Sequence, residues 1–229
     1  VMLVEQLGCP MAVGPKRQDA MEGLLLQYEL DIIISDDGLQ HHHLARHCEI
    51  VLIDTTRYFG NEFCLPAGPL REGLSRLEDV DFLVLNGSSS TTSKASSHLL
   101  DCYVDKTFHM GLQPIEFKNV FDSLRVLGLH HFLEQDVDAL AGIGAPKRFF
   151  SSLKPFVQSM SEHSYADHYD FKAADLEKFE NGKPLIMTHK DAVKCAQFAN
   201  EHSNWWYLSV NSEVDERLFQ RLLTLLKEN

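Results

Sequence analysis

The chain has 229 residues, of which 44% are hydrophobic and 24% charged, and its 33 acidic and 21 basic residues give a formal net charge of −12. This length and composition exclude a disordered or fibrous chain and are typical of one large or two modest globular domains. So acidic a protein is not expected to bind nucleic acid in general, because phosphate contacts require clustered cations. Anionic lipid headgroups would also repel it unless a local basic patch attracts them.

The cysteines are odd in number and scattered, and they form no C-x-x-C pair: Cys9, Cys48, Cys64, Cys102 and Cys195. This usage is typical of reduced thiols in a cytosolic protein. No apolar run approaches the length that spans a membrane, and no signal peptide is visible. The sequence opens at Val1 without an initiator Met, in an amphipathic stretch (VMLVEQLG) that looks like the end of a helix. We therefore expect a fragment whose natural N-terminus lies upstream.

Short apolar runs alternate with segments of helical period, and this alternation predicts an α/β fold with mostly parallel sheets and flanking helices. In the first half we expect strands at residues 11–13, 31–35, 49–54 and 81–86, and helices at residues 16–28 and near residue 74. The low-complexity stretch GSSSTTSKASS at residues 87–97 predicts a mobile surface loop.

Residues 99–128 are extended without strong periodicity, and we expect a boundary there between a lobe of residues 1–110 and a smaller C-terminal α/β lobe of residues 111–229. The second half repeats the alternation. Strands are expected at residues 138–143, 184–188 and 205–210, and helices at residues 147–157, 172–180, 191–200 and 216–227.

The first candidate site is the apolar run DIIIS followed by Asp36, Asp37, Gly38, Gln40 and His41. Acidic residues at the carboxyl end of a buried strand form the Walker B arrangement, in which an Asp holds Mg²⁺ beside nucleotide phosphates. The pattern is equally consistent with an acidic pair that caps a turn, with Gly38 supplying a positive φ.

A histidine tract follows directly, made of His41, His42, His43 and His47 with Cys48. Four histidines within seven residues invite a transition-metal interpretation. Consecutive side chains point in different directions, however, so the tract is more typical of an exposed loop than of a dedicated zinc site.

The Pro/Gly-rich segment LPAGPLRE supplies Arg71, which could clamp a phosphate, and Glu72, which could join the Asp pair around a metal. The same sequence is also consistent with a rigid loop in which the Arg–Glu pair only begins a helix.

Two further motifs flank predicted helices in the second half. His168 lies between carboxylates in the segment DHYD and is a candidate member of a general-base pair. Asp191 in the segment THKDAVK lies in the first turn of a helix, where an acidic side chain suits the helix dipole. The segment GIGAP is a strand–turn–helix junction without the complete dinucleotide-binding pattern, and no G-x-x-x-x-G-K-[ST] occurs in the chain.

Taken together and in this order, ISDDGLQH, LPAGPLRE, AGIGAPKRFF, DHYDF and THKDAVK resemble the tetraacyldisaccharide 4'-kinase family of lipid A biosynthesis. The resemblance runs the whole length of the chain and is specific, because five separate motifs fall in the family's order. It covers only the part of the family downstream of the P-loop. It implies an incomplete P-loop-kinase-like lobe joined to a smaller C-terminal α/β lobe.

The resemblance implies that ATP, with Mg²⁺, phosphorylates the 4'-hydroxyl of a tetraacyldisaccharide 1-phosphate, the lipid A disaccharide precursor. The expected location is the cytoplasmic face of a Gram-negative inner membrane, with the membrane surface contacted through a segment that this chain lacks. The fragment alone is expected to be soluble and inactive.

By motif position, Asp36 and Asp37 resemble the Walker B and neighbouring metal-site carboxylates, and Glu72 resembles the third acidic residue of that site. The residues that the resemblance places on the cofactor side are Arg71, Glu72, Gln40 and His41. His168 resembles the histidine that poises the family's catalytic aspartate, which belongs to a Gly-Asp-Glu segment that this chain does not contain.

The chain departs from the family pattern at two positions. Gly73 stands where Pro is common, which should loosen that turn, and His189 stands where Glu is usual, so we assign it no charge-dependent role. His42 and His43 are interpreted as structural. Two other interpretations stay open: a divalent-metal-binding α/β module that uses residues 41–43 of the histidine tract with Asp36 and Asp37, and a non-catalytic remnant that binds no nucleotide.

Overall fold

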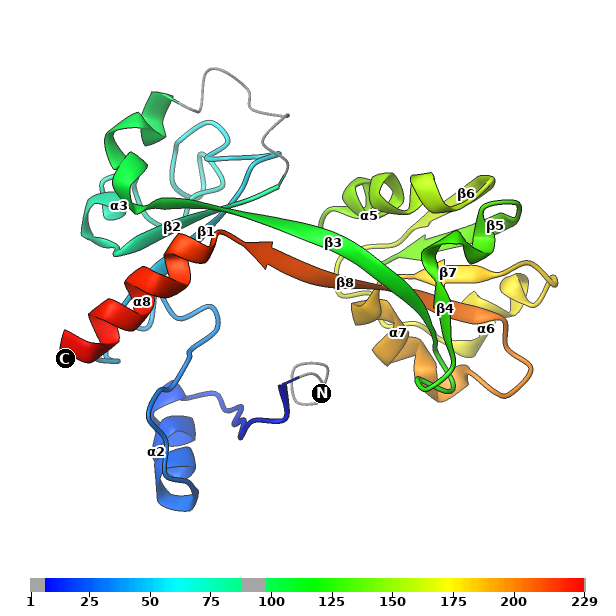
Figure 1. Ribbon diagram of the computed structural model, residues 1–229, viewed down its shortest axis with the longest axis horizontal. Helices are drawn as coiled ribbons and strands as arrows, with labels where there is room; N and C mark the ends of the chain where they lie inside the picture. The colour runs from blue at the N-terminus through cyan, green and yellow to red at the C-terminus, as the bar shows by residue number, and fades with distance from the viewer. Residues whose placement is uncertain (1–6, 88–97, 229) are drawn as a thin grey trace. The chain divides into compact units, whose positions relative to one another are not determined.

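The computed structural model of the chain describes residues 7–87 and 98–228 (Figure 1). Its contacts divide the chain into two compact units. The middle unit contains Val1–Cys9 and Gln113–Asn211, and the outer unit contains Pro10–Leu112 and Ser212–Asn229. Two long strands, β3 (Thr107–Asn119) and β8 (Trp205–Val214), run from one unit into the other.

The outer unit is built on the parallel strands β1 (Ile50–Asp54) and β2 (Phe82–Asn86) and the first residues of β3. Apolar side chains cover both faces of β2, as its unbroken apolar run predicts. One face packs against Phe59, Leu77 and Leu100, from the segments around α3 (Arg76–Asp79) and the 3-10 helix η2 (His98–Lys106). The other face packs against α8 (Glu216–Glu228), so the last helix of the sequence covers a sheet that formed from its first half.

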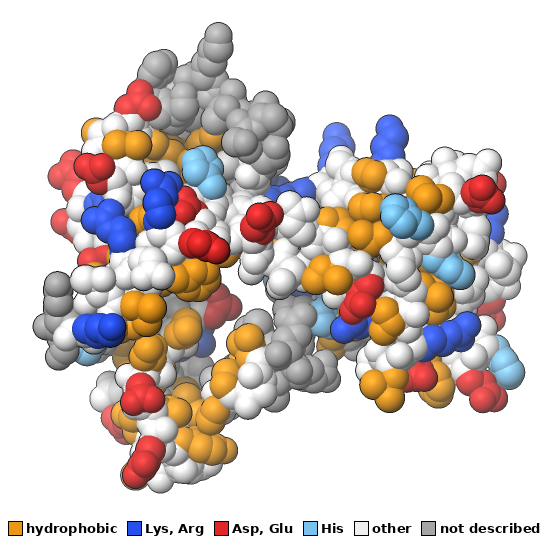
Figure 2. Space-filling view, in the orientation of Figure 1, with side chains coloured by type: hydrophobic (Ala, Val, Ile, Leu, Met, Phe, Trp, Pro, Cys, Tyr) orange, Lys and Arg blue, Asp and Glu red, His pale blue; other side chains and the backbone are white. Residues whose placement is uncertain are grey.

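The outer unit also contains α2 (Arg17–Gln27), which has no buried residue. Residues 31–35, which follow it, do not form a strand. On the face drawn in Figure 2, Lys and Arg side chains are mixed with Asp and Glu side chains over this unit and do not gather into one basic surface.

The middle unit contains a parallel sheet in the order β8-β7-β5-β6. Its remaining strands are β5 (Asp136–Ala141), β6 (Ser159–Ser164) and β7 (Leu185–Met187), and β4 (Val126–Gly128) pairs antiparallel with β3. Helix α5 (Pro146–Leu153) covers one face of the sheet, and α6 (Ala173–Leu176) and α7 (His189–Cys195) cover the other (Figure 1). Short 3-10 helices complete the unit: η3 (Leu129–Phe132), η4 (Lys154–Phe156), η5 (Glu177–Phe179) and η6 (Ala196–Phe198).

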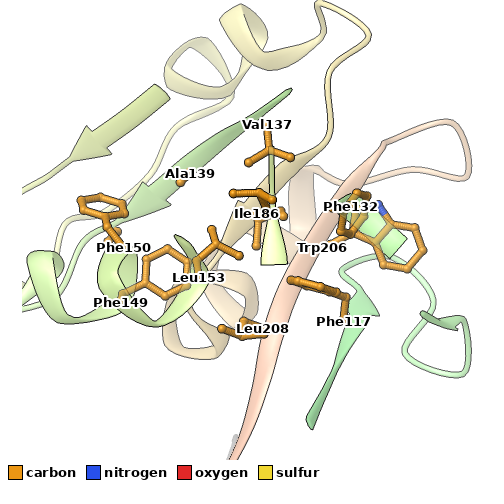
Figure 3. Packing of buried hydrophobic residues seen from close by; sticks show 12 residues of the cluster. Phe117, Phe132, Val137, Ala139, Phe149, Phe150, Leu153, Ile186, Trp206 and Leu208 are labelled. Carbon is orange, nitrogen blue, oxygen red and sulfur yellow. The ribbon is translucent and has the colours of Figure 1, made fainter. Parts of the chain in front are cut away.

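Successive side chains along β5 point to opposite faces of the sheet, so they belong to two different hydrophobic cores of the middle unit. Val137, Ala139 and Ala141 face α5, where they pack with Phe150 and Leu153 (Figure 3). Leu140 points to the opposite face and packs with residues of α6 and α7. A strand buried on both faces fixes its register strongly, because a slip of one residue would exchange the two cores.

The predicted α/β class with mostly parallel strands and flanking helices is confirmed. Three predictions of elements were wrong. Residues 11–13 are not a strand, and neither are residues 31–35, where Ile32 is 53% and Ile34 is 90% exposed. The segment has no ladder partner among the described residues, and an apolar run alone does not make a strand. Strand β6 was missed, because its sequence SMSEHS is polar, as an edge strand can be.

Two further predictions concern residues of uncertain placement. The mobile loop at residues 87–97 and the helical end at residues 1–8 lie largely outside the described residues. The extended character of residues 99–128 is correct for β3 and β4 but wrong for residues 98–106, which form η2. The division into lobes of residues 1–110 and 111–229 stays a prediction. No helix among residues 7–87 and 98–228 is both long and apolar enough to cross a membrane.

Candidate active site

The segment DDGLQH forms a tight turn in the outer unit. Asp37 has a φ of +49°, so the left-handed residue is Asp37 and not Gly38, which corrects the sequence interpretation. Gly38 is required for a different reason, because a Cβ there would lie 2.9 Å from the Ser35 hydroxyl oxygen. The amide of His41 donates to the carbonyl of Gly38 (3.0 Å) and closes the turn.

The structure brings four of the predicted site residues together. The Arg71 guanidinium lies 3.2 Å from a carboxylate oxygen of Asp37 and 3.2 Å from the side-chain oxygen of Gln40. Gln40 in turn donates to Glu72 (2.7 Å). Two segments that are more than 30 residues apart are thereby joined by side-chain hydrogen bonds. Asp37 and Arg71 are 68% and 60% exposed, so both remain accessible to a ligand.

Asp36 and His41, the other two predicted residues of this motif, contribute less. Asp36 contacts α2 instead, where its backbone carbonyl accepts from Arg17 (2.9 Å). His41 contributes its amide and its carbonyl, and its side chain is exposed.

The loop before Arg71 is rigidly built. The Asn61 side chain donates to the carbonyl of Ala67 (2.9 Å), and the amide of Leu70 donates to the carbonyl of Phe63 (3.2 Å). A Cβ at Gly68 would lie 2.1 Å from the Asn61 side-chain oxygen, so only glycine fits this close approach. The rigid loop therefore fixes the backbone position from which the side chains of Arg71 and Glu72 extend.

A second layer of charged side chains lies behind this cluster. Arg76 contacts Glu72 (3.3 Å) and Glu49 (2.6 Å), and Glu49 also contacts Arg46 (3.1 Å). The hydrogen bond with Glu49 raises the pKa of Arg76 above its ordinary value. Sequence reasoning missed these residues, although the spacings of Glu72 to Arg76 and of Arg46 to Glu49 are those of helical ion pairs.

Among residues 7–87 and 98–228, no three His, Cys, Asp or Glu side chains converge on a point that could hold a metal ion. The histidine tract therefore gives the metal-binding-module interpretation no support. Burial, with help from Asp81 and Glu49, raises the pKa of Cys48 to about 11, which disfavours the thiolate that would bind zinc. Mg²⁺ is a different case, because it usually takes one or two carboxylates and completes its shell with phosphate oxygens and water. The carboxylate oxygens of Asp36, Asp37 and Glu72 are of the kind that this chemistry uses, but the three side chains do not converge on one point.

The middle unit holds the second cluster, at the carboxyl ends of its parallel strands. The Lys190 ammonium lies 3.5 Å from Asp167 and 3.5 Å from Nε2 of His168. Burial alone would raise the pKa of Asp167, but Lys190 and His168 outweigh it and hold this pKa below its ordinary value. The His168 side chain is 76% exposed and its backbone φ is +61°.

The carboxylate of Asp191 fixes the start of α7, the helix that carries Lys190. It is completely buried and accepts hydrogen bonds from the amide of Gly142 (2.9 Å) and the hydroxyl of Thr188 (2.7 Å). Thr188 also caps α7 by accepting from the amide of Asp191. His189, at the position of departure from the family pattern, stacks on Tyr207 with ring centroids 4.4 Å apart.

In the middle unit, parallel strands deliver polar side chains at their carboxyl ends, which is where α/β proteins bind ligands. The chain is therefore an α/β protein of a ligand-binding class. A family model described as Tetraacyldisaccharide-1-P 4'-kinase matches residues 1–227, and the chain belongs to this family.

Individual relatives agree with the family. The chain is similar to a tetraacyldisaccharide 4'-kinase of Hydrogenovibrio crunogenus, with 45% identity over 92% of this chain and 59% of the relative. A protein of the same name from Haemophilus influenzae is 43% identical over 94% of this chain and 60% of the relative. The chain thus spans about six tenths of the length of these curated relatives.

The fold is also similar to a solved structure, the "apo" form of LpxK from Aquifex aeolicus in complex with ATP. The TM-score is 0.57 at 26% identity, over 83% of this chain and 56% of that one.

Proposed function

We propose that the natural protein that carries this sequence transfers the γ-phosphoryl group of ATP to the 4'-hydroxyl of a tetraacyldisaccharide 1-phosphate, a lipid A precursor. The observation that carries the proposal is the convergence of Asp37, Gln40, Arg71 and Glu72 from two separate segments. Family membership identifies the reaction, and this cluster supplies the kind of side chains that phosphoryl transfer requires.

In this proposal Asp36, Asp37 and Glu72 hold Mg²⁺, which when bound neutralises charge on the phosphates. The ion pair between Arg71 and Asp37 is exposed and exchangeable. On nucleotide binding the Arg71 guanidinium turns to phosphate oxygens, and the Asp37 carboxylate is released from its cation. Before nucleotide binds, Gln40 links the two segments through its hydrogen bonds with Arg71 and Glu72. The 229 residues contain no G-x-x-x-x-G-K-[ST], so the proposal assigns no phosphate-gripping loop to this chain.

His168 is proposed to orient the base that accepts the proton of the sugar hydroxyl. Nε2 of His168 lies 3.5 Å from the Lys190 ammonium, which can only donate, so in this proposal Nε2 acts as the acceptor. Nδ1–H is then able to donate to a carboxylate. Asp167 keeps Lys190 in place, and its low pKa keeps it ionised for that task.

The substrate class implies a place of action. A disaccharide that bears four acyl chains resides in a membrane, so we propose peripheral association of the natural protein with the cytoplasmic face of a Gram-negative inner membrane. This chain, with its formal charge of −12, does not itself favour an anionic surface.

The test is a transfer assay with radiolabelled ATP and the detergent-dispersed lipid. In the natural protein, Asp37→Ala and His168→Ala should each lower kcat by at least about tenfold, since electrostatic and general-base contributions reach that size. Glu201→Gln is the matched control, because this carboxylate is 77% exposed and its ion-pair partner is the neighbouring His202. Turnover of either variant within about twofold of the unsubstituted protein would remove that residue from the mechanism. Absence of both MgATP binding and turnover in the natural protein would favour the non-catalytic interpretation, in which no nucleotide is bound.

A further inference from the structure

Three charged side chains in the outer unit have no part in the chemistry proposed above. They are Arg46, Glu49 and Arg76, and their side chains are 24%, 12% and 23% exposed. The Glu49 carboxylate lies between the two guanidiniums, 3.1 Å from Arg46 and 2.6 Å from Arg76. Removing charged groups from water is unfavourable unless the geometry is well satisfied, so such a triad is weak evidence for stability.

Arg46 connects the triad to the acidic turn. Its guanidinium donates to the backbone carbonyls of Gly38 (3.0 Å), Leu39 (3.1 Å) and His41 (3.3 Å). These carbonyls belong to the turn that carries Asp36, Asp37 and Gln40. The planar five-donor fork of arginine suits such multiple contacts, whereas a lysine ammonium cannot reproduce them.

Arg76 connects the triad to the other half of the site. Its Nε lies 3.3 Å from one oxygen of Glu72, while the second oxygen of Glu72 accepts from Gln40 (2.7 Å). The Glu49 carboxylate is therefore connected to both proposed metal-site segments. Arg46 connects it to the acidic turn, and Arg76 connects it to Glu72.

Glu49 is itself anchored to the sheet. Its amide donates to the Asp81 carboxylate (2.7 Å), and its carbonyl accepts from the amides of Asp81 and Phe82 (3.1 Å each). Glu49 therefore occupies a fixed position at the start of β1 and β2, where the core of the outer unit begins.

We infer that Glu49 is a positioning residue that sets the acidic turn and Glu72 relative to each other through the two arginines. The inference rests on the proposed function for its catalytic consequence. Its structural consequence can be measured without any turnover.

The first measurement is amide hydrogen exchange. Glu49→Gln keeps the shape of the side chain, but it removes the negative charge between the two guanidiniums and turns one acceptor oxygen into a donor, so the contacts with both arginines weaken. The amides of His41 and Leu44, which close the turn, should then exchange at least about tenfold faster. The matched control is Asp79→Asn, which alters a second carboxylate partner of Arg76 that lies 3.8 Å away and is 76% exposed. The control should change exchange by less than about twofold. Equal exchange in Glu49→Gln and the unsubstituted chain would overturn the inference.

The second measurement is kinetic and uses the natural protein. Glu49→Gln should lower kcat by at least about tenfold and raise the Mg²⁺ concentration for half-maximal rate, because small displacements of catalytic groups are costly. Loss through unfolding would instead lower the active fraction without changing the Mg²⁺ dependence. Should Glu49→Gln fail to fold, Arg46→Lys replaces it in both measurements, since it keeps the charge and removes the fork.

The outcomes separate the two proposals. Faster exchange with kcat and Mg²⁺ dependence unchanged would overturn the positioning role while the kinase proposal stands. An unsubstituted natural protein that transfers no phosphoryl group would refute the proposed function, and with it the catalytic part of the inference. The exchange result would then still decide whether Glu49 fixes the turn.

Discussion

Replacement of Asp191 by alanine should destabilise the middle unit strongly. The carboxylate is completely buried, and it is the acceptor for the amide of Gly142 and the hydroxyl of Thr188. A buried donor left without a partner costs about 1–3 kcal/mol, so two such donors cost about 4 kcal/mol together. Asp191→Asn can keep the one oxygen that accepts both hydrogen bonds and loses mainly the contact with Lys194 (3.5 Å), so it should cost less than Asp191→Ala. A total stability of about 5–15 kcal/mol makes either loss easy to detect.

The assay is urea unfolding followed by tryptophan fluorescence. Both tryptophans of the chain, Trp205 and Trp206, are buried in β8, so their emission reports the unit that contains Asp191. With a urea dependence of about 2 kcal/mol per molar, the midpoint of Asp191→Ala should fall by about 2 M. Asp170→Ala, an exposed carboxylate of the same unit, is the control and should leave the midpoint unchanged. A fall of less than about 0.5 M in Asp191→Ala would refute the reasoning.

Two further outcomes follow from ionisable side chains. Burial raises the pKa of Cys48 to about 11 and that of Cys195 to about 12, so a thiol reagent at neutral pH should spare both in the native chain and modify the exposed Cys9, Cys64 and Cys102. Rapid modification of Cys195 without denaturant would contradict this. Burial opposes ionisation of Asp138, but hydrogen bonds from His163 and Asn181 hold its pKa below the ordinary value. A depressed pKa contributes stability that is present above the unfolded value and is lost as the pH falls through the folded value, so His163→Phe should be less stable near neutral pH and should lose less stability than the unsubstituted chain as the pH falls through that range. Superimposable acid-unfolding curves would exclude this coupling.

Much of the fold was predictable because burial leaves a trace in the sequence. The run FLVLN became β2, whose side chains are buried on both faces, and LIM became the fully buried β7. Amphipathic spacing likewise located α8 to within one residue. The same reasoning fails where hydrophobic residues are exposed or where a strand is polar. Residues 31–35 contain three consecutive isoleucines yet are largely exposed, and the polar strand β6 carries no periodic signal.

The candidate site was predictable only in part, for a related reason. Sequence motifs named Asp37, Arg71 and Glu72, but not that Arg71 would contact Asp37 across 34 positions. Asp191 could be placed in the first turn of a helix by its effect on the dipole. Its burial, and its bond to Gly142 at a separation of 49 residues, depend on how strands are ordered in the sheet. Contacts of this kind are properties of the tertiary fold, and no local pattern encodes them.

The order of the two units along the chain has a consequence for biosynthesis. Phe82 and Val84 lie in the first half of the sequence, but the helix that covers them, α8, follows the entire middle unit. A ribosome that works from the N-terminus therefore exposes this apolar sheet face while the 129 residues between Asn86 and Glu216 are still being made. The middle unit is contiguous from Gln113 to Asn211 and can fold first. The outer unit completes its fold last. Until α8 is made, the apolar face of β2 stays exposed on the nascent chain, where chaperones can bind it and where it favours aggregation.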